Sequence, residues 1–240
     1  MEVHHHAHTA RKKWTHYFWE FFMLFLAVFC GYLAERKLEH DIERQREKKY
    51  MKTLAADLKK DIQEIDRLDS FRLGREKQLD TLIDLLGKEK LPPYTKEIYR
   101  LADTTDGYES FLRNDRTIQQ LKNAGNMRLI DETVAAAIMN YDNYIISEID
   151  WNNRTEASRI DYYKQQRFQL FDTESMIHIS NKDTAFRLKL MPATPLIINT
   201  IRGNIFQVKR ISETNRKSGE TARAKARELL AAIEKEYHIP

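Results

Sequence analysis

The feature that most constrains this chain is an apolar stretch near its N-terminus, YFWEFFMLFLAVFCGYLA at residues 17–34. Glu20 is its only charged residue. The uninterrupted apolar run, residues 21–34, is short for a bilayer-spanning helix, which needs about 20 residues. A helix that starts at Trp14 has the required length, and charged residues bound it at 11–13 and at 35–37. We therefore predict a transmembrane helix over residues 14–34.

Aromatic and basic residues flank this segment as they do in membrane anchors. The aromatic residues expected at the two membrane interfaces are Trp14, Tyr17 and Trp19 on one side and Tyr32 on the other. The residues expected to contact lipid headgroups are Arg11, Lys12 and Lys13. The lipid bilayer is thus the first predicted partner.

Other interpretations of the stretch are a cleaved signal peptide, a lipoprotein signal and a buried core helix. No small-x-small cleavage site follows the apolar core, and Phe29 is too large to precede a lipidated Cys30. Lys and Arg counts favour a cytoplasmic C-terminus, yet the downstream cations alternate with acids and long domains cross regardless of charge. The basic cluster at 11–13 has no nearby acid except Glu2. We predict a single-pass protein of a bacterial inner membrane, with its helical domain on the periplasmic side.

The rest of the chain has the composition of a helical protein. Seven glycines and five prolines in 240 residues are few, which disfavours an all-β fold and favours long helices. The predicted fold class is all-α, with one N-terminal transmembrane helix followed by an antiparallel helical bundle that has a long first helix. The expected divisions are a flexible His-rich and basic tail at 1–13, the span at 14–34, a charged helical stalk at 35–50 and the bundle domain at 51–240.

Periodic apolar residues place the helices of this domain. The first helix is expected to reach about residue 68, and an apolar seam on it steps by four and three: Met51, Ala55, Leu58, Ile62 and Ile65. This seam fits a partner helix in the same chain or in a second copy. A second helix is expected to end at Gly87, a short one to cover 96–102 and another to begin near residue 115. A longer helix is expected to run from Asp131 to about residue 171, and Pro192 and Pro195 are expected to start the final one. Residues 173–190 are ambiguous between strand and loop.

Three stretches together resemble a known family. The aromatic-rich span at 14–34 is followed by the stretch 35–61, which begins with E-R-K and ends with Y-M-x-x-L-x-x-D-L-x-x-D. The third stretch, 117–141, begins with T-I-x-x-L-K-x-x-G-N-x-x-L-I-D and continues into a Tyr-rich helix. This order resembles an uncharacterised bacterial family of single-span membrane proteins with a helical domain. The resemblance covers most of the chain and implies a topology. It implies no activity, so no catalytic residue is carried over.

The sequence contains no motif for a catalytic, cofactor or metal site. A Ser-His-Asp arrangement, a Gly-rich phosphate loop and an HExxH pair are all missing, and the single cysteine excludes a Cys-based metal site. The histidines His4, His5, His6 and His8 could hold a transition metal, but no predicted order preorganises them. The net charge of +4 does not indicate a nucleic-acid partner. We predict no catalytic residue, cofactor, metal or nucleic acid.

Several charged groups have both a functional and a structural interpretation. A carboxylate at membrane depth, Glu20, could couple ion flow to work, or could pair with His16 one turn away. The acids near Asp61 and the cations of the C-terminal helix are expected to form solvated faces, with lipid headgroups as an alternative for the cations. The tyrosines Tyr141, Tyr144, Tyr162 and Tyr163 are expected in the core, or around a small pocket.

These observations predict a membrane-anchored, non-enzymatic interaction or scaffold protein, a subunit or partner of a membrane complex. Self-association or docking to another membrane protein would use the seam and the stalk. Two alternatives remain open. One is a helical sensor domain that binds a small ligand, and the other is an accessory subunit of an ion-driven membrane machine that uses Glu20.

Overall fold

The computed structural model describes residues 14–183 and 185–239, and the regular structure in these ranges is helical. The α-helices are α1 (Trp14–Leu85), α2 (Thr95–Asp106), α3 (Arg116–Asn123), α4 (Glu132–Tyr144), α5 (Asp150–Gln166), α6 (Thr173–Ser180) and α7 (Pro195–Tyr237). Short 3-10 helices are η1 (Pro92–Tyr94), η2 (Asn126–Leu129) and η4 (Arg167–Gln169), and a π-helix, η3 (Ile145–Ile149), joins α4 to α5. Among the described residues, Phe171 and Leu190 form an isolated antiparallel β-bridge. The all-α class and the long first helix are confirmed.

The first helix is longer than predicted. It runs for 72 residues without the expected end near residue 68. The reason is that its seven-residue pattern continues from Leu68 through two polar residues, Arg72 and Arg75, to Leu79 and Leu82, and all five are buried. In the sequence, polar residues at these positions suggest that the amphipathic helix has ended. In the structure they are buried within a helix that continues.

The chain separates into two compact units, Met1–Lys49 and Tyr50–Pro240. In the first unit, every described residue from 14 to 42 is exposed. Within the described part of the chain, α1 is the one helix long and apolar enough to cross a membrane, with its most apolar window entirely unburied. Length and composition alone would also suit a signal sequence.

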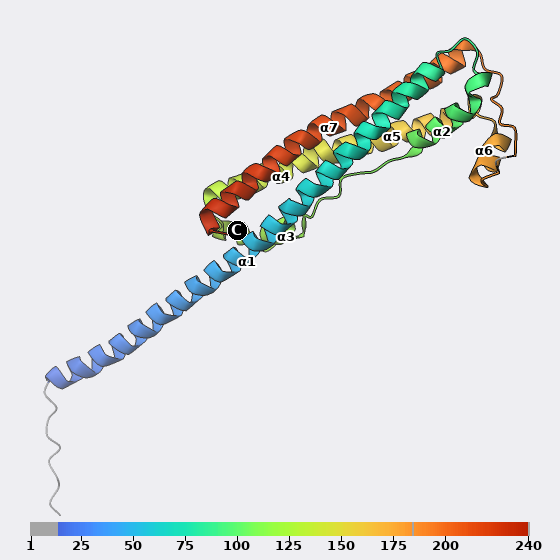
Figure 1. The fold of residues 1–240 in the computed structure, drawn as a ribbon. Helices are drawn as coiled ribbons and strands as arrows, with labels where there is room; N and C mark the ends of the chain where they lie inside the picture. The colour runs from blue at the N-terminus through green and yellow to red at the C-terminus, as the bar shows by residue number, and fades with distance from the viewer. Residues whose placement is uncertain (1–13, 184, 240) are drawn as a thin grey trace, which may run out of the picture. The chain divides into compact units, whose positions relative to one another are not determined.

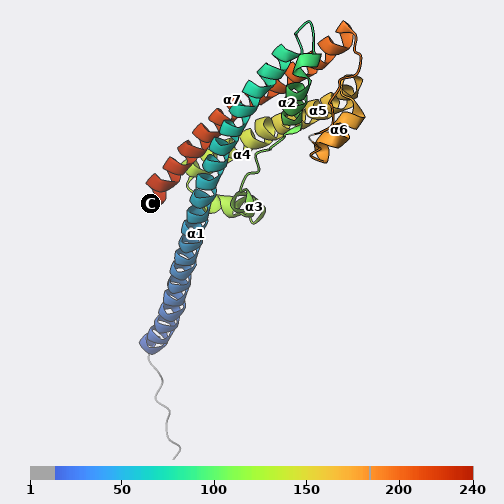
Figure 2. The same ribbon diagram turned by 45° about the vertical axis from the view of Figure 1, so that its right-hand side comes forward.

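The second unit is built around two long helices that lie side by side, residues 50–85 of α1 and the whole of α7 (Figure 1). Contacts between the two helices join decreasing residue numbers of α1 to increasing residue numbers of α7. Arg202 donates to the Ile83 carbonyl at 3.1 Å, Lys209 lies 2.6 Å from Asp80, and Lys59 lies 3.5 Å from Glu234. These two helices therefore run in opposite directions. Helices α4 and α5 pack along α7, as a second view also shows (Figure 2).

The core of this unit consists of two apolar clusters. The first cluster joins α1, α4 and the C-terminal half of α7, and includes Leu54, Leu58, Ile138, Leu229 and Ile233. The second joins the end of α1, α2, the end of α5 and the start of α7, and includes Leu82, Ile98, Tyr163, Ile205 and Val208. Between them, at residues 69–78 of α1 and 212–219 of α7, the buried side chains are mostly polar. This polar layer is the main irregularity of the core.

Caps and prolines place the shorter elements. The Asp131 side chain accepts hydrogen bonds from the backbone amides of Thr133 and Val134, so the predicted start of α4 is confirmed. Pro195 occupies the first turn of α7, as predicted, and the Thr194 side chain caps the helix. The ambiguous segment 173–190 contains α6, which is capped by Asp172. Its described residues after α6 form turns and bends, with an isolated bridge at Leu190.

We predict that replacing a seam residue will destabilise the second unit. Leu58 is 1% exposed, so Leu58→Ala leaves a cavity and should lower the free energy of unfolding by about 2–5 kcal/mol. Leu112 is 78% exposed, and Leu112→Ala should change it by less than about 0.5 kcal/mol. Urea unfolding of the full-length protein in mild detergent, followed by circular dichroism, measures both values. Equal effects would mean that the seam is not packed in the folded chain.

Candidate functional site

The residues predicted as an interaction seam are packed against their own chain. Met51, Ala55, Leu58 and Ile65 are buried in the first cluster, and the half-buried Ile62 packs against it. The other α-helices in this cluster are α3, α4 and α7 of the same molecule. Of the two partners considered from the sequence, the structure therefore provides the one within the chain, and the seam is not a free surface for a second copy.

The predicted anchor residues lie on the exposed part of α1. Trp14, Tyr17, Trp19 and Tyr32 are all exposed. Glu20 Oε1 lies 3.0 Å from His16 Nε2, one turn away, which is the pairing expected from the structural interpretation. The predicted headgroup contacts Arg11, Lys12 and Lys13, and the histidines His4, His5, His6 and His8, lie outside the described residues.

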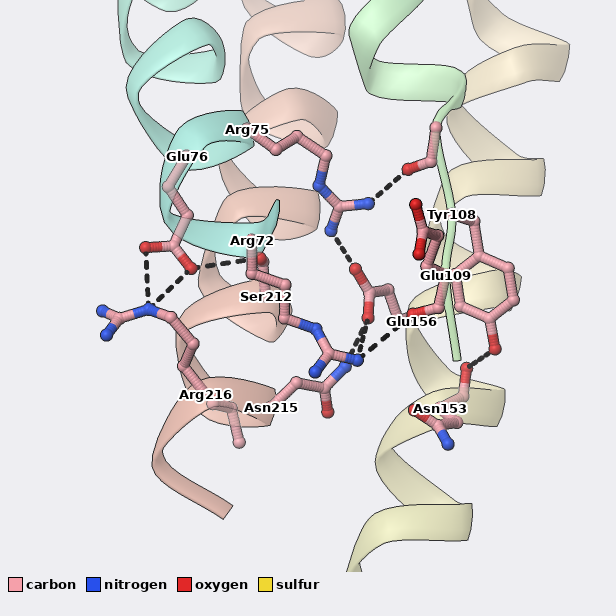
Figure 3. A network of polar contacts seen from close by, with 12 residues as sticks. Arg72, Arg75, Glu76, Tyr108, Glu109, Asn153, Glu156, Ser212, Asn215 and Arg216 are labelled. Carbon is pink, nitrogen blue, oxygen red and sulfur yellow. Dashed lines mark hydrogen bonds and ion pairs between the residues drawn. The ribbon is translucent and has the colours of Figure 1, made fainter. Parts of the chain in front are cut away.

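The most unusual site within the described chain is the polar layer, defined here as Arg72, Arg75, Glu76, Glu156, Ser212, Asn215 and Arg216 (Figure 3). Glu156 of α5 is 1% exposed and lies at its centre. Its carboxylate accepts hydrogen bonds from Arg75 of α1 and from the Asn215 side chain of α7. Arg72 Nη2 lies 3.8 Å from the same carboxylate. One acid thus joins three helices.

The two arginines have further partners on the segment between α2 and α3. Arg75 donates to the Gly107 carbonyl, and Arg72 donates to the Glu109 carbonyl at 3.3 Å. The Tyr108 hydroxyl donates to the Asn153 carbonyl of α5 at 3.0 Å. The polar layer therefore holds this irregular segment against the helices.

Glu76 forms the second half of the layer, between α1 and α7. The Ser212 hydroxyl donates to Glu76 Oε1 at 3.1 Å, and Arg216 Nε lies 3.2 Å from both carboxylate oxygens. Gly219 lies one turn further along α7, where an added Cβ would be 3.3 Å from Asp69 Oδ1. The two helices approach closely at this point, because α7 presents small or short polar side chains to α1.

Because these charges are buried, removing one of them should lower the stability of the folded protein. Burial lowers the pKa of Arg72, and the neighbouring Glu156 charge opposes that shift. A buried pair contributes little compared with an apolar pair of the same shape, but the loss of one member leaves a buried charge without compensation. We therefore expect the layer to tolerate a matched replacement of its charges much better than the replacement of one charge alone.

Sequence reasoning missed this site, although a signal was present. Buried positions of α7 follow a seven-residue repeat through Ile205, Val208, Ser212, Asn215 and Gly219. Positions 72 and 75 continue the repeat of α1 in the same way. Polar residues that occupy apolar positions of a heptad on more than one helix are the sequence signature of such a layer.

The expectation of a solvated acidic face is wrong for Asp61, which is 2% exposed. Its Oδ1 accepts hydrogen bonds from the Asn114 backbone amide at 2.9 Å and side-chain amide at 2.8 Å, and its Oδ2 accepts one from the Tyr141 hydroxyl at 2.7 Å. Burial raises the pKa of Asp61, and the hydrogen bonds from Asn114 and Tyr141 oppose the shift. Asp61 thus fastens the segment before α3, together with α4, to α1.

The expectation of a solvated cationic face on the C-terminal helix is also wrong for several residues. Arg223 pairs with Asp66 and lies 3.2 Å from Asp69 Oδ2, and Lys209 and Arg216 bind acids of α1. These cations are largely covered and join α7 to α1. The sequence alone does not show which helix lies opposite these cations, so their burial could not be predicted from it.

The four predicted tyrosines divide between the core and the surface. Tyr141 and Tyr163 are buried, Tyr144 is half-buried and Tyr162 is exposed. Burial raises the pKa of both Tyr141 and Tyr163. The described residues contain no group of three or more His, Cys, Asp or Glu side chains placed to hold a metal ion.

An open cavity of about 550 Å³ lies near one end of the second unit, between α2 and the segment that includes α6. Its apolar lining includes Pro93, Tyr99, Ile179, Phe186 and Leu188. A second hollow of about 730 Å³ shares Pro92, Thr95 and Leu188 with it. We call the first of these the α2–α6 cavity.

Comparison with known proteins gives no relative: no family model, no curated protein and no solved structure matches this chain.

We predict that Glu156→Gln will strongly destabilise the protein. The substitution removes the charge between Arg72 and Arg75, and the loss should be about 3–5 kcal/mol of unfolding free energy. Glu148→Gln, an exposed substitution beside α5, is the matched control and should change it by less than about 0.5 kcal/mol. Denaturant unfolding of the full-length variants measures both.

The triple variant Arg72→Met, Arg75→Met, Glu156→Leu separates charge from packing. Because it removes both signs together, it should recover most of the stability that Glu156→Gln loses. A triple variant less stable than Glu156→Gln would show that the hydrogen bonds of the layer, and not its charge balance, hold the helices together.

Proposed function

We propose that this protein is a membrane-anchored interaction protein whose helical domain binds another membrane protein. The observation that carries the anchor is the exposure of residues 14–34 on all sides of α1. A helix that is apolar all round belongs in a protein core or in a bilayer. These 21 residues extend about 31 Å as a helix, which matches the roughly 30 Å hydrocarbon core of a membrane.

The continuity of α1 supports an anchor over a cleaved signal. The helix passes from Ala34 through the charged stalk to Leu85 without a break, so cleavage after the apolar run would cut through a helix. In this proposal the span lies in a bacterial inner membrane with the domain on the periplasmic side, and the domain is an antiparallel helical bundle. Membership of the uncharacterised single-span family is part of the same proposal.

The outer face of α5 supports the interaction role. Trp151, Arg154, Ser158 and Tyr162 lie on one side of this helix, because their spacings of three, four and four residues return to the same face. Trp151 is 56% exposed, and Tyr162 is exposed beside a shallow hollow that Arg154 and Ser158 also line. Trp, Tyr and Arg are the residues most enriched in interface hot spots. We call these four residues the α5 face and assign the partner contact to it.

We predict that two charges in the apolar run will remove the protein from membranes. Arginine near the centre of a span costs roughly 2.5–3.5 kcal/mol, so Leu24→Arg with Leu26→Arg should release most of the protein on alkaline carbonate extraction. The wild type should stay in the pellet. Leu38→Arg, with Leu38 exposed beyond the run, is the control and should stay there too. If mass spectrometry finds a mature N-terminus after residue 34, the apolar stretch is a cleaved signal peptide and not an anchor.

We predict that Trp151→Ala with Tyr162→Ala will abolish capture of a membrane-protein partner. The change removes both aromatic anchors, each expected to cost about 2 kcal/mol or more of binding free energy. Leu112→Ala, which removes an exposed apolar residue away from α5, should leave capture unchanged. Extraction in mild detergent followed by pull-down and quantitative mass spectrometry measures the effect. Recovery of the chain alone, or of a second copy alone, contradicts docking to another protein.

A second candidate function, a sensor domain that binds a small ligand, is favoured by the α2–α6 cavity. Its volume lies within the range of about 300–1,000 Å³ that small-molecule sites occupy. The pairing of Glu20 with His16 gives no comparable support to the third alternative, ion coupling.

A further inference from the structure

The α2–α6 cavity combines apolar walls with a mainly cationic rim. Tyr99 and Phe186 provide aromatic surface, and Ile179 and Leu188 provide aliphatic surface. Cations among the lining residues outnumber acids three to two, and in the adjoining hollow three to one. An apolar site with a few polar groups that fix orientation is the usual composition of a ligand pocket.

Several of the rim charges are already used within the protein. Arg100 binds Glu97 through two hydrogen bonds, at 2.9 and 2.6 Å. Asp183 Oδ2 lies 2.8 Å from His178 Nδ1, and Asp183 Oδ1 accepts a hydrogen bond from the Ala185 amide at 3.0 Å. Lys96 and Lys182 are exposed residues of the cavity lining, and Asp103 is the other lining acid. Over the cavity and the adjoining hollow together, lining cations outnumber lining acids by six to three, and this excess favours an anion.

A buried hydrogen-bond network holds the walls in place. The Tyr99 hydroxyl, from α2, donates to the Lys189 carbonyl at 2.8 Å and accepts from the Asp172 amide at 2.9 Å. The Ser175 hydroxyl donates to Asp172 Oδ2 at 2.8 Å and accepts from the Lys189 amide at 3.1 Å. These bonds tie the start of α6 and the strand-like residues near 189 to α2. The cavity is thus preformed, which lowers the cost of binding.

Phe186 of the cavity lining stacks on an aromatic ring that is not part of the lining. The rings of His178 and Phe186 stack with centroids 3.8 Å apart and planes 5° from parallel. Phe186 lines the cavity, so a flat aromatic ligand can pack against a ring whose position is already fixed. A ligand with an aliphatic tail would gain less binding free energy from packing against Phe186 than an aromatic ligand would.

We propose that the α2–α6 cavity binds a small organic anion with an aromatic body, its charge placed at Lys96 and Lys182. This inference rests on the second candidate function, ligand sensing, and is independent of the membrane anchor and of the α5 face. The aromatic body packs between Tyr99, Phe186 and Leu188. The lysines hold the carboxylate at the rim by charge–charge attraction.

The test is isothermal titration calorimetry of 1-naphthoate into the full-length protein in nanodiscs, with empty nanodiscs as the blank. We expect saturable binding at one site per chain. Naphthalene-1-carboxamide, which has the same shape without the charge, should bind at least about fivefold more weakly. Equal binding of the two compounds, or no saturable binding of 1-naphthoate, overturns the proposal.

Variants locate the site. Lys96→Glu with Lys182→Glu should weaken naphthoate binding roughly tenfold, because two attractions become repulsions. Lys52→Glu with Lys217→Glu, which reverses two exposed lysines outside the cavity lining, should leave it unchanged. Ile179→Trp should block the cavity, and Ile179 is 39% exposed, so the larger side chain does not need room in the core. Circular dichroism confirms that each variant is folded.

Outcomes at the cavity and at the α5 face are separable. If naphthoate binding is absent while Trp151→Ala with Tyr162→Ala still abolishes partner capture, the ligand site is wrong and the interaction function stands. If the Lys96 and Lys182 reversals leave binding unchanged, the anion site in this cavity is wrong whatever the pull-down shows.

Discussion

The buried carboxylate of Glu156 is the constraint on which the packing of the helical domain depends. It accepts hydrogen bonds from Arg75 of α1 and Asn215 of α7 while itself belonging to α5, so three helices meet at one charge. A buried ion loses its hydration, so hydrogen-bonding and charged groups of the protein must surround it, and they do so in only one packing arrangement of the helices. Apolar contacts are less demanding, because leucines and isoleucines can slide past one another with a modest loss.

This layer gives the two long helices one register. Apolar residues repeat along α1 and α7 with the same seven-residue spacing, so a shift by one heptad would still place apolar side chains opposite each other. Such a shift would place Arg72 and Arg75 against an apolar cluster and would separate Glu76 from Ser212 and Arg216. The polar layer lies between the two clusters, where it opposes slippage in both directions.

The sequence predicts helices well and their neighbours poorly. Asp131 and Pro195 mark helix starts by local hydrogen bonding and backbone geometry, which do not depend on the rest of the fold. Whether Asp61 or Arg223 is solvated depends on what another helix places opposite it, and one sequence does not contain that pairing. The same limit explains the expected end of α1 near residue 68. Arg72 and Arg75 look like surface residues until Glu156, more than eighty residues later, is known to face Arg75.

The exposed apolar surfaces of the chain differ in kind, and the difference supports separate roles. In the domain, α7 and the second half of α1 have one apolar side and one charged side, and the apolar side is already filled. Apart from Thr15, His16 and Glu20 near its start, the segment 14–34 has no polar side, and its exposure in the described chain leaves the rest of its circumference to be covered by some other apolar environment. A protein partner would have to surround the helix, whereas a bilayer does so by its nature. The α5 face is the opposite case, because its aromatic residues are isolated among polar ones. That composition is stable in water, and we propose it for the partner contact.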